Sequence, residues 1–444
     1  MTQIKCLVLL FIPFLLPAQQ NKQELISQYM EAQEKVNGFS GVVLVAKGNK
    51  VVYEKSFGLA DREGNIPNTP TTKFRIYSVS KQFTAVCILK LAEENKLSLQ
   101  DNLAKFFPDF PNGDHITIQM LLTHTSGLRR DFLKPSDGPY KYIDFIGQAI
   151  SKEEILSIVK KTPPESSPGK KESYSNLGFL MLGYIVEKAS GMSYAEFISQ
   201  NIFVPLHMTN SGVCSKKETC PGMAVGYNRV ADNRLLPGLM NMDFLTGCGN
   251  IYSTAEDLYK WENSFYGSVI LSESLRNQKL APYVNRVGYG PQLDTLFRHA
   301  CTSVRGSAFG YEAAVASFHE DSTAIIVLSN NESASGRINY SLAGILWDVP
   351  VTLPYPHQTI SMDKTLLNKY AGRFGNTKIN KKKGHLYLNN VEESMLLPES
   401  TNKFYLADKS DWTIEFVLDT KGNVVAMISS IGGISETISK TTRE

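Results

Sequence analysis

The sequence predicts an α+β fold: an antiparallel sheet sandwiched by helices, plus an all-helical lobe, followed by a small C-terminal antiparallel β domain. Two runs of strand-forming residues at 42–54 surround a Gly-Asn turn and predict a hairpin. A second predicted hairpin spans 311–330, with its turn at 319–322. Between the hairpins, apolar residues recur mostly at helical spacing. Strands from both ends of one domain must then pair antiparallel around a long helical insertion, leaving a cleft between sheet and lobe.

Helices are expected where this spacing is clearest, and local stop and start signals support two of them. Ser253-Thr254 before Glu256-Asp257 suits a helix start. Gly191 suits a helix end. The expected helices cover residues 22–36, 80–95, 177–189, 193–201, 254–266 and 337–347.

The pattern changes near residue 350, where Pro350, Pro354 and Pro356 indicate a linker. We therefore divide the chain into a main domain at 19–350, a linker at 351–362 and a β domain at 363–444. In the last of these, short strands are expected at 386–388, 403–406, 414–418 and 424–429. This β domain shows no cluster of histidine or acidic residues at a telling spacing.

Composition excludes several classes of function. The 444 residues include 46 Lys and Arg and 43 Asp and Glu, a formal charge of +3, which argues against a nucleic-acid partner. Lys5 precedes an apolar run from Cys6 to Leu16 that is too short to span a membrane. Residues 1–18 are instead expected to be a signal peptide, which implies a secreted or periplasmic protein without a membrane span.

Five cysteines follow the expected signal peptide, an odd number that is too small for a disulfide scaffold. Cys214 and Cys220 flank a polar loop, and a disulfide and two free thiols are equally compatible with the sequence. No cysteine shows metal-ligand spacing with histidine, and His124 has no histidine partner nearby, so it is interpreted as structural. We expect no metal or organic cofactor.

Ser78-Val79-Ser80-Lys81 stands at the start of an apolar helix. Ser78 and Lys81 are three residues apart and face the same side of a helix. A serine hydroxyl becomes a nucleophile when a neighbour removes its proton, and a lysine one turn on can do this or can hold a second base in place. Alone, the motif is weak, because a serine near a helix start is usually a cap.

Tyr174-Ser175-Asn176 lies at a second junction between loop and helix. A phenol needs cationic neighbours to act as a base at neutral pH, and Lys81 can supply that charge. Asn176 offers an amide to a substrate carbonyl. Considered alone, a buried tyrosine beside an asparagine cap is the simpler interpretation.

The third segment is Val304-Arg305-Gly306-Ser307. Gly306 on an edge strand would let a ligand approach closely. The backbone N–H groups of Ser307 and Ser78 could together form an oxyanion hole. The simpler interpretation is an ordinary glycine-containing entry to a strand.

Taken in this order, the three segments resemble the active-site motifs of the serine β-lactamase and penicillin-binding-protein family. The branch most similar contains class C β-lactamases, D-alanyl-D-alanine carboxypeptidases and family VIII esterases, in which a tyrosine stands in the second motif. The segments Leu121–Leu128 (LLTHTSGL) and Ser253–Leu258 (STAEDL) also resemble that family. The resemblance covers about residues 24–347 and implies the same two-lobed, β-lactamase/transpeptidase-like architecture.

One departure concerns the third motif, where the family usually has Lys or His and this chain has Val304. In the family that residue helps to position the tyrosine and the substrate carboxylate. Arg305 comes next, but strand alternation aims it at the opposite face. Arg298-His299 could take the role only if the loop were rearranged. The loss weakens the case for β-lactams and D-Ala-D-Ala peptides more than for esters or amides.

The sequence therefore predicts a secreted serine hydrolase acting through an acyl-enzyme on a small-molecule or peptide substrate. Ser78, Lys81 and Tyr174 are its expected catalytic residues, and Asn176, Arg305, Gly306 and Ser307 are expected to bind substrate. The expected substrate is an ester or amide, as for an esterase, a D-Ala-D-Ala carboxypeptidase or a β-lactamase, and the oligomeric state is left open. One alternative is a catalytically weakened binding or regulatory protein on the same scaffold. Another is an adhesion role, which requires an exposed aromatic patch in residues 363–444.

Overall fold

The computed structural model describes residues 22–131, 133–134, 138–139, 150–214, 220–229, 235–237, 241–267, 269–389, 391, 394–407 and 409–441. The expected signal peptide at 1–18 lies outside the described residues. The five cysteines that follow it are free thiols, so Cys214 and Cys220 are not joined in this structure.

A six-stranded antiparallel sheet forms the centre of the main domain, in the order β12-β13-β14-β15-β1-β2. The two expected hairpins are confirmed and lie side by side, since β1 pairs with β15 from Gly41–Ser329 to Ala46–Ala324. The strands are β1 (Gly41–Lys47), β2 (Lys50–Phe57), β12 (Gln292–Leu296), β13 (His299–Ala308), β14 (Tyr311–Phe318) and β15 (Thr323–Ser329).

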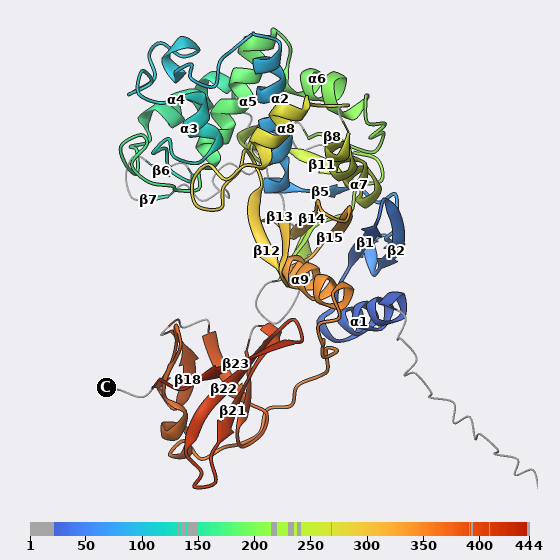
Figure 1. Cartoon of the computed structure of the whole chain (residues 1–444), viewed down its shortest axis with the longest axis vertical. Helices are drawn as coiled ribbons and strands as arrows, with labels where there is room; N and C mark the ends of the chain where they lie inside the picture. The colour runs from blue at the N-terminus through green and yellow to red at the C-terminus, as the bar shows by residue number, and fades with distance from the viewer. Residues whose placement is uncertain are drawn as a thin grey trace, which may run out of the picture.

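Helices cover both faces of this sheet (Figure 1). Helices α1 (Lys22–Asn37) and α9 (Ser335–Leu346) pack on one face, where Val43 and Val45 of β1 join their hydrophobic cluster. Val42 and Leu44 point to the other face and join the cluster of the helical lobe. Because β1 is buried on both faces, it is apolar without alternation.

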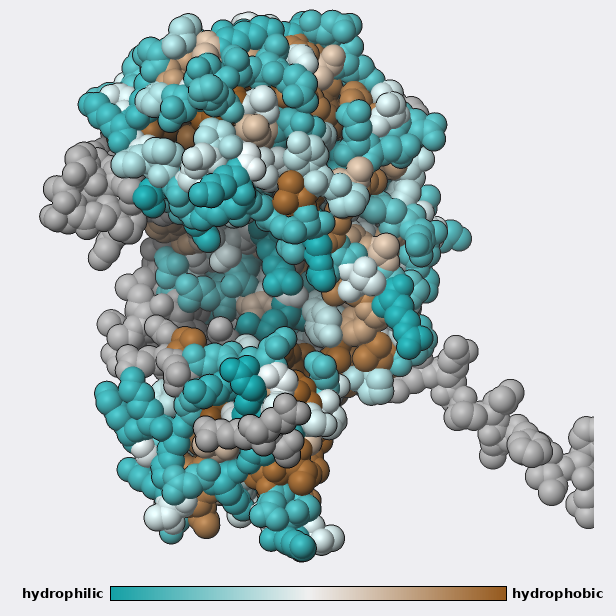
Figure 2. All heavy atoms as spheres, turned by 60° about the vertical axis from the view of Figure 1, so that its left-hand side comes forward, coloured by the Kyte–Doolittle hydropathy of each residue, from teal (hydrophilic) through white to brown (hydrophobic). Residues whose placement is uncertain are grey.

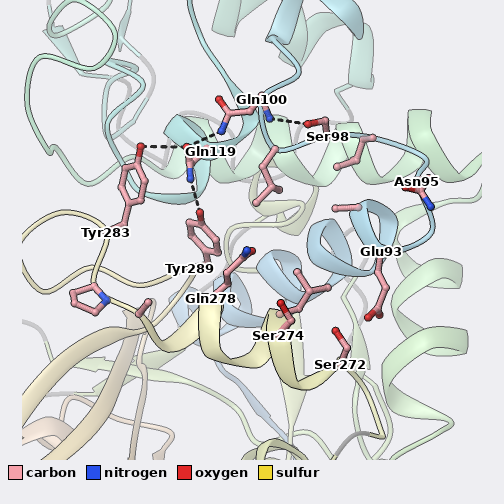
Figure 3. Close-up of a pocket in the computed structure, with 16 residues that line it drawn as sticks. Glu93, Asn95, Ser98, Gln100, Gln119, Ser272, Ser274, Gln278, Tyr283 and Tyr289 are labelled. Carbon is pink, nitrogen blue, oxygen red and sulfur yellow. Dashed lines mark hydrogen bonds between the residues drawn. The ribbon is translucent and has the colours of Figure 1, made fainter.

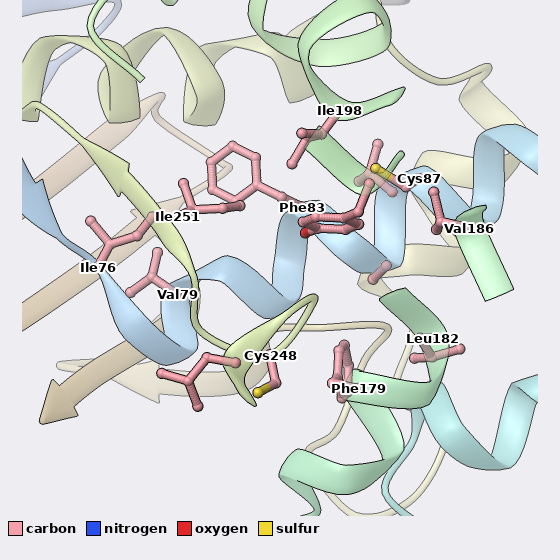
Figure 4. Close-up of a cluster of buried hydrophobic side chains, with 14 of the residues drawn as sticks. Ile76, Val79, Phe83, Cys87, Phe179, Leu182, Val186, Ile198, Cys248 and Ile251 are labelled. Atoms are coloured by element: carbon pink, nitrogen blue, oxygen red, sulfur yellow. The ribbon is translucent and has the colours of Figure 1, made fainter. Parts of the chain in front are cut away.

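The helical lobe is built around α2, which is buried on almost every side. Phe83 of α2 stacks on Trp261 with ring centroids 4.0 Å apart, and Figure 4 shows Phe83 among the apolar side chains of neighbouring elements. The helices of this part are α2 (Ser80–Glu93), α3 (Ile118–Leu122), α4 (Lys152–Lys161), α5 (Asn176–Ser190), α6 (Tyr194–Ile198), α7 (Ala255–Asn263) and α8 (Glu273–Leu280).

Four further, small sheets are found among the described residues. The sheet nearest to the start of α2 is ordered β5-β11-β8. Its strands and those of the other three sheets are β5 (Phe74–Arg75), β11 (Ile251–Ser253), β8 (Gly212–Val213), β3 (Leu59–Asp61), β4 (Ile66–Pro67), β9 (Tyr227–Arg229), β10 (Leu235–Pro237), β6 (Leu133–Lys134) and β7 (Gly138–Pro139).

The C-terminal domain is one eight-stranded antiparallel sheet whose strands follow chain order. A bridge between Phe374 and Lys440 brings its two edges together, so the sheet is a nearly closed barrel around an aromatic core. Its strands are β16 (Gly372–Phe374), β17 (Thr377–Lys382), β18 (His385–Leu388), β19 (Met395–Pro398), β20 (Lys403–Leu406), β21 (Lys409–Leu418), β22 (Val424–Ile431) and β23 (Ile434–Ser439).

The barrel contacts the main domain through the turn between β22 and β23. The Ser341 hydroxyl of α9 donates to the Gly432 carbonyl at 2.6 Å. Arg337, also on α9, pairs with the buried carboxylate of Asp411. The linker is tied to the same turn, because the Thr352 N–H donates to the Gly433 carbonyl. Figure 1 shows this arrangement, with the barrel next to α9 and α1.

The surface offers little support for the adhesion alternative. Among the described residues of 363–444, the large hydrophobic side chains that are exposed are aliphatic: Leu366, Val391, Leu418 and Val425. The face in Figure 2 is largely hydrophilic, with small hydrophobic groups on the barrel. No helix in the described part of the chain is long and apolar enough to cross a membrane.

Candidate active site

Ser78 lies in a single helical turn, Tyr77–Val79, that leads directly into α2. Its neighbours Tyr77 and Val79 are buried, whereas Ser78 itself is partly exposed. Tyr77 has a φ of 42°, a left-handed conformation that costs energy for a residue with a side chain. The surrounding core holds this strained turn, and Ser78 stands at the beginning of α2.

Lys81 is almost fully buried beneath Ser78, and its ammonium has three acceptors. They are the Ser78 Oγ at 3.2 Å, the Asn176 Oδ1 at 2.7 Å and the Cys248 carbonyl at 2.8 Å. A charged ammonium has three N–H groups, whereas a neutral amine has two. The three acceptors therefore favour a charged Lys81, which cannot accept a proton from Ser78.

Tyr174 is a second side chain in contact with Ser78. Its hydroxyl donates to the Ser78 Oγ at 2.8 Å, and its side chain is 37% exposed. Two cations lie over its ring: the Lys81 Nζ at 4.8 Å from the centroid and the Arg130 guanidinium at 5.5 Å. Both are cation–π contacts with the ring that carries the hydroxyl. The structure thus brings together the three residues expected to be catalytic.

His124 holds the segment that carries Tyr174. Its carbonyl accepts from the Ser173 N–H at 2.8 Å, and its Nδ1 accepts from the Ser175 N–H at 3.1 Å. Burial and the charge of Lys81 lower the pKa of His124 to about 3, so the ring stays neutral and Nδ1 can accept. Its ring lies 4.6 Å from that of Tyr174. From the sequence, His124 was interpreted as structural. Its place in the LLTHTSGL segment was the one signal that it lies near the active site.

The Asn176 side chain forms hydrogen bonds within the protein, so it is not wholly available to a substrate. Its Oδ1 accepts from Lys81, and its Nδ2 donates to Asp131 at 2.7 Å. Its backbone N–H donates to the Arg130 carbonyl. One N–H of Nδ2 is left to contact a substrate, and the main effect of the side chain is to hold Lys81. Sequence reasoning missed Asp131, which no motif marked.

The third motif lies on β13, next to Ser78. A two-residue turn at Phe309 and Gly310, both with positive φ, joins β13 to β14, so Ala308–Tyr311 is a hydrogen-bonded pair. Because hydrogen bonding to a neighbouring strand alternates from residue to residue, the Ser307 N–H points away from β14. On that side β12 pairs with β13 only as far as Ser303, so the edge of β13 beyond Ser303 is free of β12. This free edge faces the serine turn.

Gly306 permits the close contact between β13 and that turn. A methyl group at this position would lie 2.1 Å from the Ile76 carbonyl oxygen and 2.8 Å from the Ser78 nitrogen. Only a glycine fits without displacement. The amides of Ser78 and Ser307 therefore border the same space, as the oxyanion-hole hypothesis requires.

The structure does not bring Arg305 to Ser78. Arg305 pairs with Ala314, which faces α1 and α9, and its side chain covers Gly336 of α9. Our expectation that Arg305 binds substrate is therefore not supported, because strand alternation sends it to the other face. Val304 packs against the cluster of the helical lobe.

The upstream pair Arg298-His299 does not replace the missing cation either. Arg298 lies in the turn between β12 and β13. His299 stacks on Trp347 with ring centroids 4.6 Å apart, at the end of α9. Among the described residues of the third motif, none therefore supplies a basic side chain to Ser78 in place of Val304.

This fold and this trio of serine, lysine and tyrosine define a class of protein, the serine hydrolases of the β-lactamase and penicillin-binding-protein group. In agreement, residues 23–340 match the Beta-lactamase family, and the chain belongs to that family.

Three similar proteins carry related names. "Penicillin-binding protein 4*" of Bacillus subtilis is 26% identical over 438 residues, which cover 90% of this chain and 95% of that protein. "Putative penicillin-binding protein PbpX" of the same organism is 31% identical over 59% of this chain, and the match spans 63% of its own length. The crystal structure of a penicillin-binding protein from Bacillus halodurans has 27% identity and a TM-score of 0.64, covering 72% of this chain and 99% of that one.

Proposed function

We propose that this protein is a secreted hydrolase that cleaves an ester or amide through an acyl-enzyme on Ser78. The observation that carries the proposal is the geometry at the Ser78 Oγ, with the Tyr174 hydroxyl at 2.8 Å and the Lys81 Nζ at 3.2 Å. A binding protein has no need of a nucleophile in contact with both a phenol and an ammonium.

In the proposed acylation, Tyr174 acts as the base in its ionised form, with Lys81 and Arg130 offsetting its charge. The Ser78 Oγ attacks the carbonyl carbon as its proton passes to the Tyr174 oxygen. The Ser78 and Ser307 N–H groups hold the oxyanion. The bond to the leaving group then breaks, and that group takes the proton from Tyr174.

In the deacylation, a water gives its proton to Tyr174 and attacks the acyl carbon. The bond to Ser78 breaks, and the proton on Tyr174 passes to the Ser78 Oγ, which leaves Ser78 neutral and Tyr174 ionised, as before acylation. Asn176 keeps Lys81 below the serine in both steps.

The substrate class follows from Val304. Without a cation at that position, a substrate carboxylate loses a charge-assisted hydrogen bond worth roughly 1.5–3 kcal/mol, or about 10–150-fold. We therefore propose a preference for uncharged esters or amides over β-lactams and D-Ala-D-Ala peptides. The expected signal peptide supports action outside the cytoplasm.

The test uses a fluorophosphonate probe for activated serines, followed by mass mapping of the labelled peptide, together with turnover of p-nitrophenyl esters. We expect labelling at Ser78, and loss of both labelling and turnover in Ser78→Ala. Unchanged ester turnover in Ser78→Ala would overturn the assignment. Labelling without turnover of any ester, amide or β-lactam would favour the alternative of a weakened binding or regulatory protein.

A second measurement addresses the substrate class. Matched esters with and without a carboxylate are compared, and Val304→His is expected to raise reactivity toward β-lactams more than toward neutral esters. A natural preference for the carboxylate-bearing ester would contradict the proposed substrate class. If Arg305→Ala then removed that preference, Arg305 would be the missing cation after all.

A further inference from the structure

A cavity of about 740 Å³ lies beside α2, outside the catalytic site (Figure 3). Its volume is within the range of roughly 300–1,000 Å³ that is typical of ligand pockets. One wall is formed by the loop after α2 and by α3, the opposite wall by α8, and one end by the loop at 281–289.

The lining is polar but almost uncharged. Of the sixteen described residues that line the cavity, nine carry a neutral hydroxyl or amide side chain, and Glu93 alone is charged. Leu97, Leu99 and Leu275 add apolar surface between these polar groups. Such a lining offers many hydrogen bonds and no cation, which disfavours an anionic ligand.

One wall is already organised by hydrogen bonds. The Gln119 Oε1 accepts from the Gln100 Nε2 at 3.0 Å and from the Tyr283 hydroxyl at 3.2 Å. Its Nε2 donates to the Tyr289 hydroxyl at 2.6 Å. The two tyrosine rings lie 6.3 Å apart, and Tyr283 is 48% exposed. Fixed amides beside an accessible aromatic ring lower the entropy cost of binding a polar ligand.

The other wall presents hydroxyl and amide groups on one side of α8. Ser274 and Gln278 are four residues apart and exposed on the same face of the helix. Ser272 is at the N-cap of α8 but makes no side-chain capping bond, so its hydroxyl is not consumed by the helix. Figure 3 shows Ser272 and Ser274 across the cavity from Gln100 and Gln119.

The loop at 281–289 links the cavity to the catalytic residues. Ala92 and Glu93 at the end of α2 line one end. At the other, Tyr289 precedes Gly290, which packs on Gln82 in the first turn of the same helix. Asn285 of this loop also donates to Glu172, two residues before Tyr174. The loop that closes one end of the cavity therefore also contacts the first turn of α2 and the segment that carries Tyr174.

We propose that this cavity binds an uncharged oligosaccharide of a few sugar rings. Sugars present hydroxyls to amides and hydroxyls, and present their C–H faces to aromatic and aliphatic side chains, which is the mixture found here. A peptide is less suited, because peptide sites use a free strand edge, an apolar groove or a cation for a terminal carboxylate. The described residues that line this cavity belong to helices and loops and include no cation.

The experiment is calorimetry on the full chain with chitotetraose, cellotetraose and maltotetraose, and with anionic tetragalacturonate. It is run in parallel on Ser78→Ala, so that failure of the proposed hydrolysis does not affect the result. We expect at least one neutral tetrasaccharide to bind with a stoichiometry of one, and tetragalacturonate to bind about tenfold more weakly or not at all.

Two substitutions locate the ligand. Tyr283→Ala and Gln278→Ala are each expected to weaken binding about fivefold or more, as loss of one ring contact or hydrogen-bonding side chain predicts. Asn277→Ala is the matched control, since Asn277 is exposed on α8 next to Gln278 and does not line the cavity. Its affinity should not change.

Several results would overturn the proposal. One is that no neutral tetrasaccharide binds at a ligand concentration of about 10 mM. Another is that Tyr283→Ala or Gln278→Ala leaves the affinity unchanged. A third is that tetragalacturonate binds more tightly than the neutral sugars. Binding of an uncharged, end-blocked tetrapeptide in place of the sugars would also do so, and would assign the cavity to a peptide instead.

Discussion

At the scale of single residues, the hydrogen bonds of Lys81 decide which group acts as the base. All three of its N–H groups have acceptors, two of them outside the reacting pair, so the ammonium is held in place and stays charged. Among the described side chains, Tyr174 also contacts the Ser78 Oγ. The chemistry therefore divides between a tyrosine that moves protons and a lysine that supplies fixed charge.

Tyr174→Phe tests this division. Removing the phenol oxygen should lower the turnover of neutral esters by roughly 10²–10⁴, the usual contribution of a general base. The ring that packs on His124 is retained, so the unfolding midpoint should barely move. Tyr387→Phe, in the C-terminal domain, is the control for loss of a hydroxyl far from Ser78. Normal turnover in Tyr174→Phe would show that another group takes the proton.

His124 gives a prediction about pH and stability. Its pKa is about 3 in the folded protein and near ~6.5 in an unfolded chain, so the unfolded state binds more protons between these values. The contribution of His124 is complete above the unfolded value and is lost as the pH falls toward 3. At pH 5 the loss is roughly 2 kcal/mol. His319, with a pKa of about 4, acts in the same direction.

Urea unfolding between pH 8 and pH 5 measures this effect. His124→Asn does not titrate, and its amide oxygen can still accept from the Ser175 N–H, so its free energy of unfolding should fall less on acidification. An identical pH dependence in the two proteins would mean that His124 is not buried in its neutral form.

Much of the site was predictable from sequence, because motif residues with chemical function stand out by type and spacing. Ser78, Lys81 and Tyr174 converge as expected. The residues that hold them did not stand out. Asn176 forms hydrogen bonds with Lys81 and Asp131, and His124 forms them with the backbone on either side of Tyr174. These contacts depend on loops that meet only in the folded chain.

At the scale of secondary structure, β13 is the element that completes the site. Its backbone reaches the serine turn because Gly306 has no side chain. Gly306→Ala should displace β13 from Ser78, and a shift of that order lowers turnover by about 10–100-fold. Gly267→Ala is the control, since nothing lies within 4 Å of a methyl group there. Wild-type turnover in Gly306→Ala would show that the Ser307 amide is not needed.

The elements that sequence predicted are those with strong burial patterns. The helix at 80–95 is confirmed as α2, and Gly191 ends α5 in a left-handed conformation. Strands such as β12 and β17 were missed because they are short and polar. The sequence of β17, for example, is TKINKK. Their strand geometry comes from pairing with neighbours, a long-range cause that local patterns do not report.

At the scale of the whole molecule, the C-terminal barrel contacts the main domain at the end opposite the helical lobe (Figure 1). It contacts α9 through Asp411 and Gly432, and α9 packs on the sheet that contains β13. Among the described residues, the contacts of Ser78, Lys81 and Tyr174 all come from the main domain. The barrel is thus expected to affect stability more than chemistry.

A chain ending at residue 355 tests this expectation. It keeps all six strands of the central sheet and the catalytic residues, so it should fold and should hydrolyse small neutral esters at nearly the rate of the full chain. It should also melt several degrees lower, because Arg337 loses Asp411, the Ser341 hydroxyl loses the Gly432 carbonyl, and the apolar contact of Ile434 with α9 is removed. Circular dichroism and thermal unfolding measure the folding and the melting temperature.

Asp411→Asn in the full chain separates the ion pair from the rest of the interface, and should account for only part of the decrease in melting temperature. A well-folded shortened chain without esterase activity would instead mean that the barrel, acting through α9, sets the position of β13 at the nucleophile.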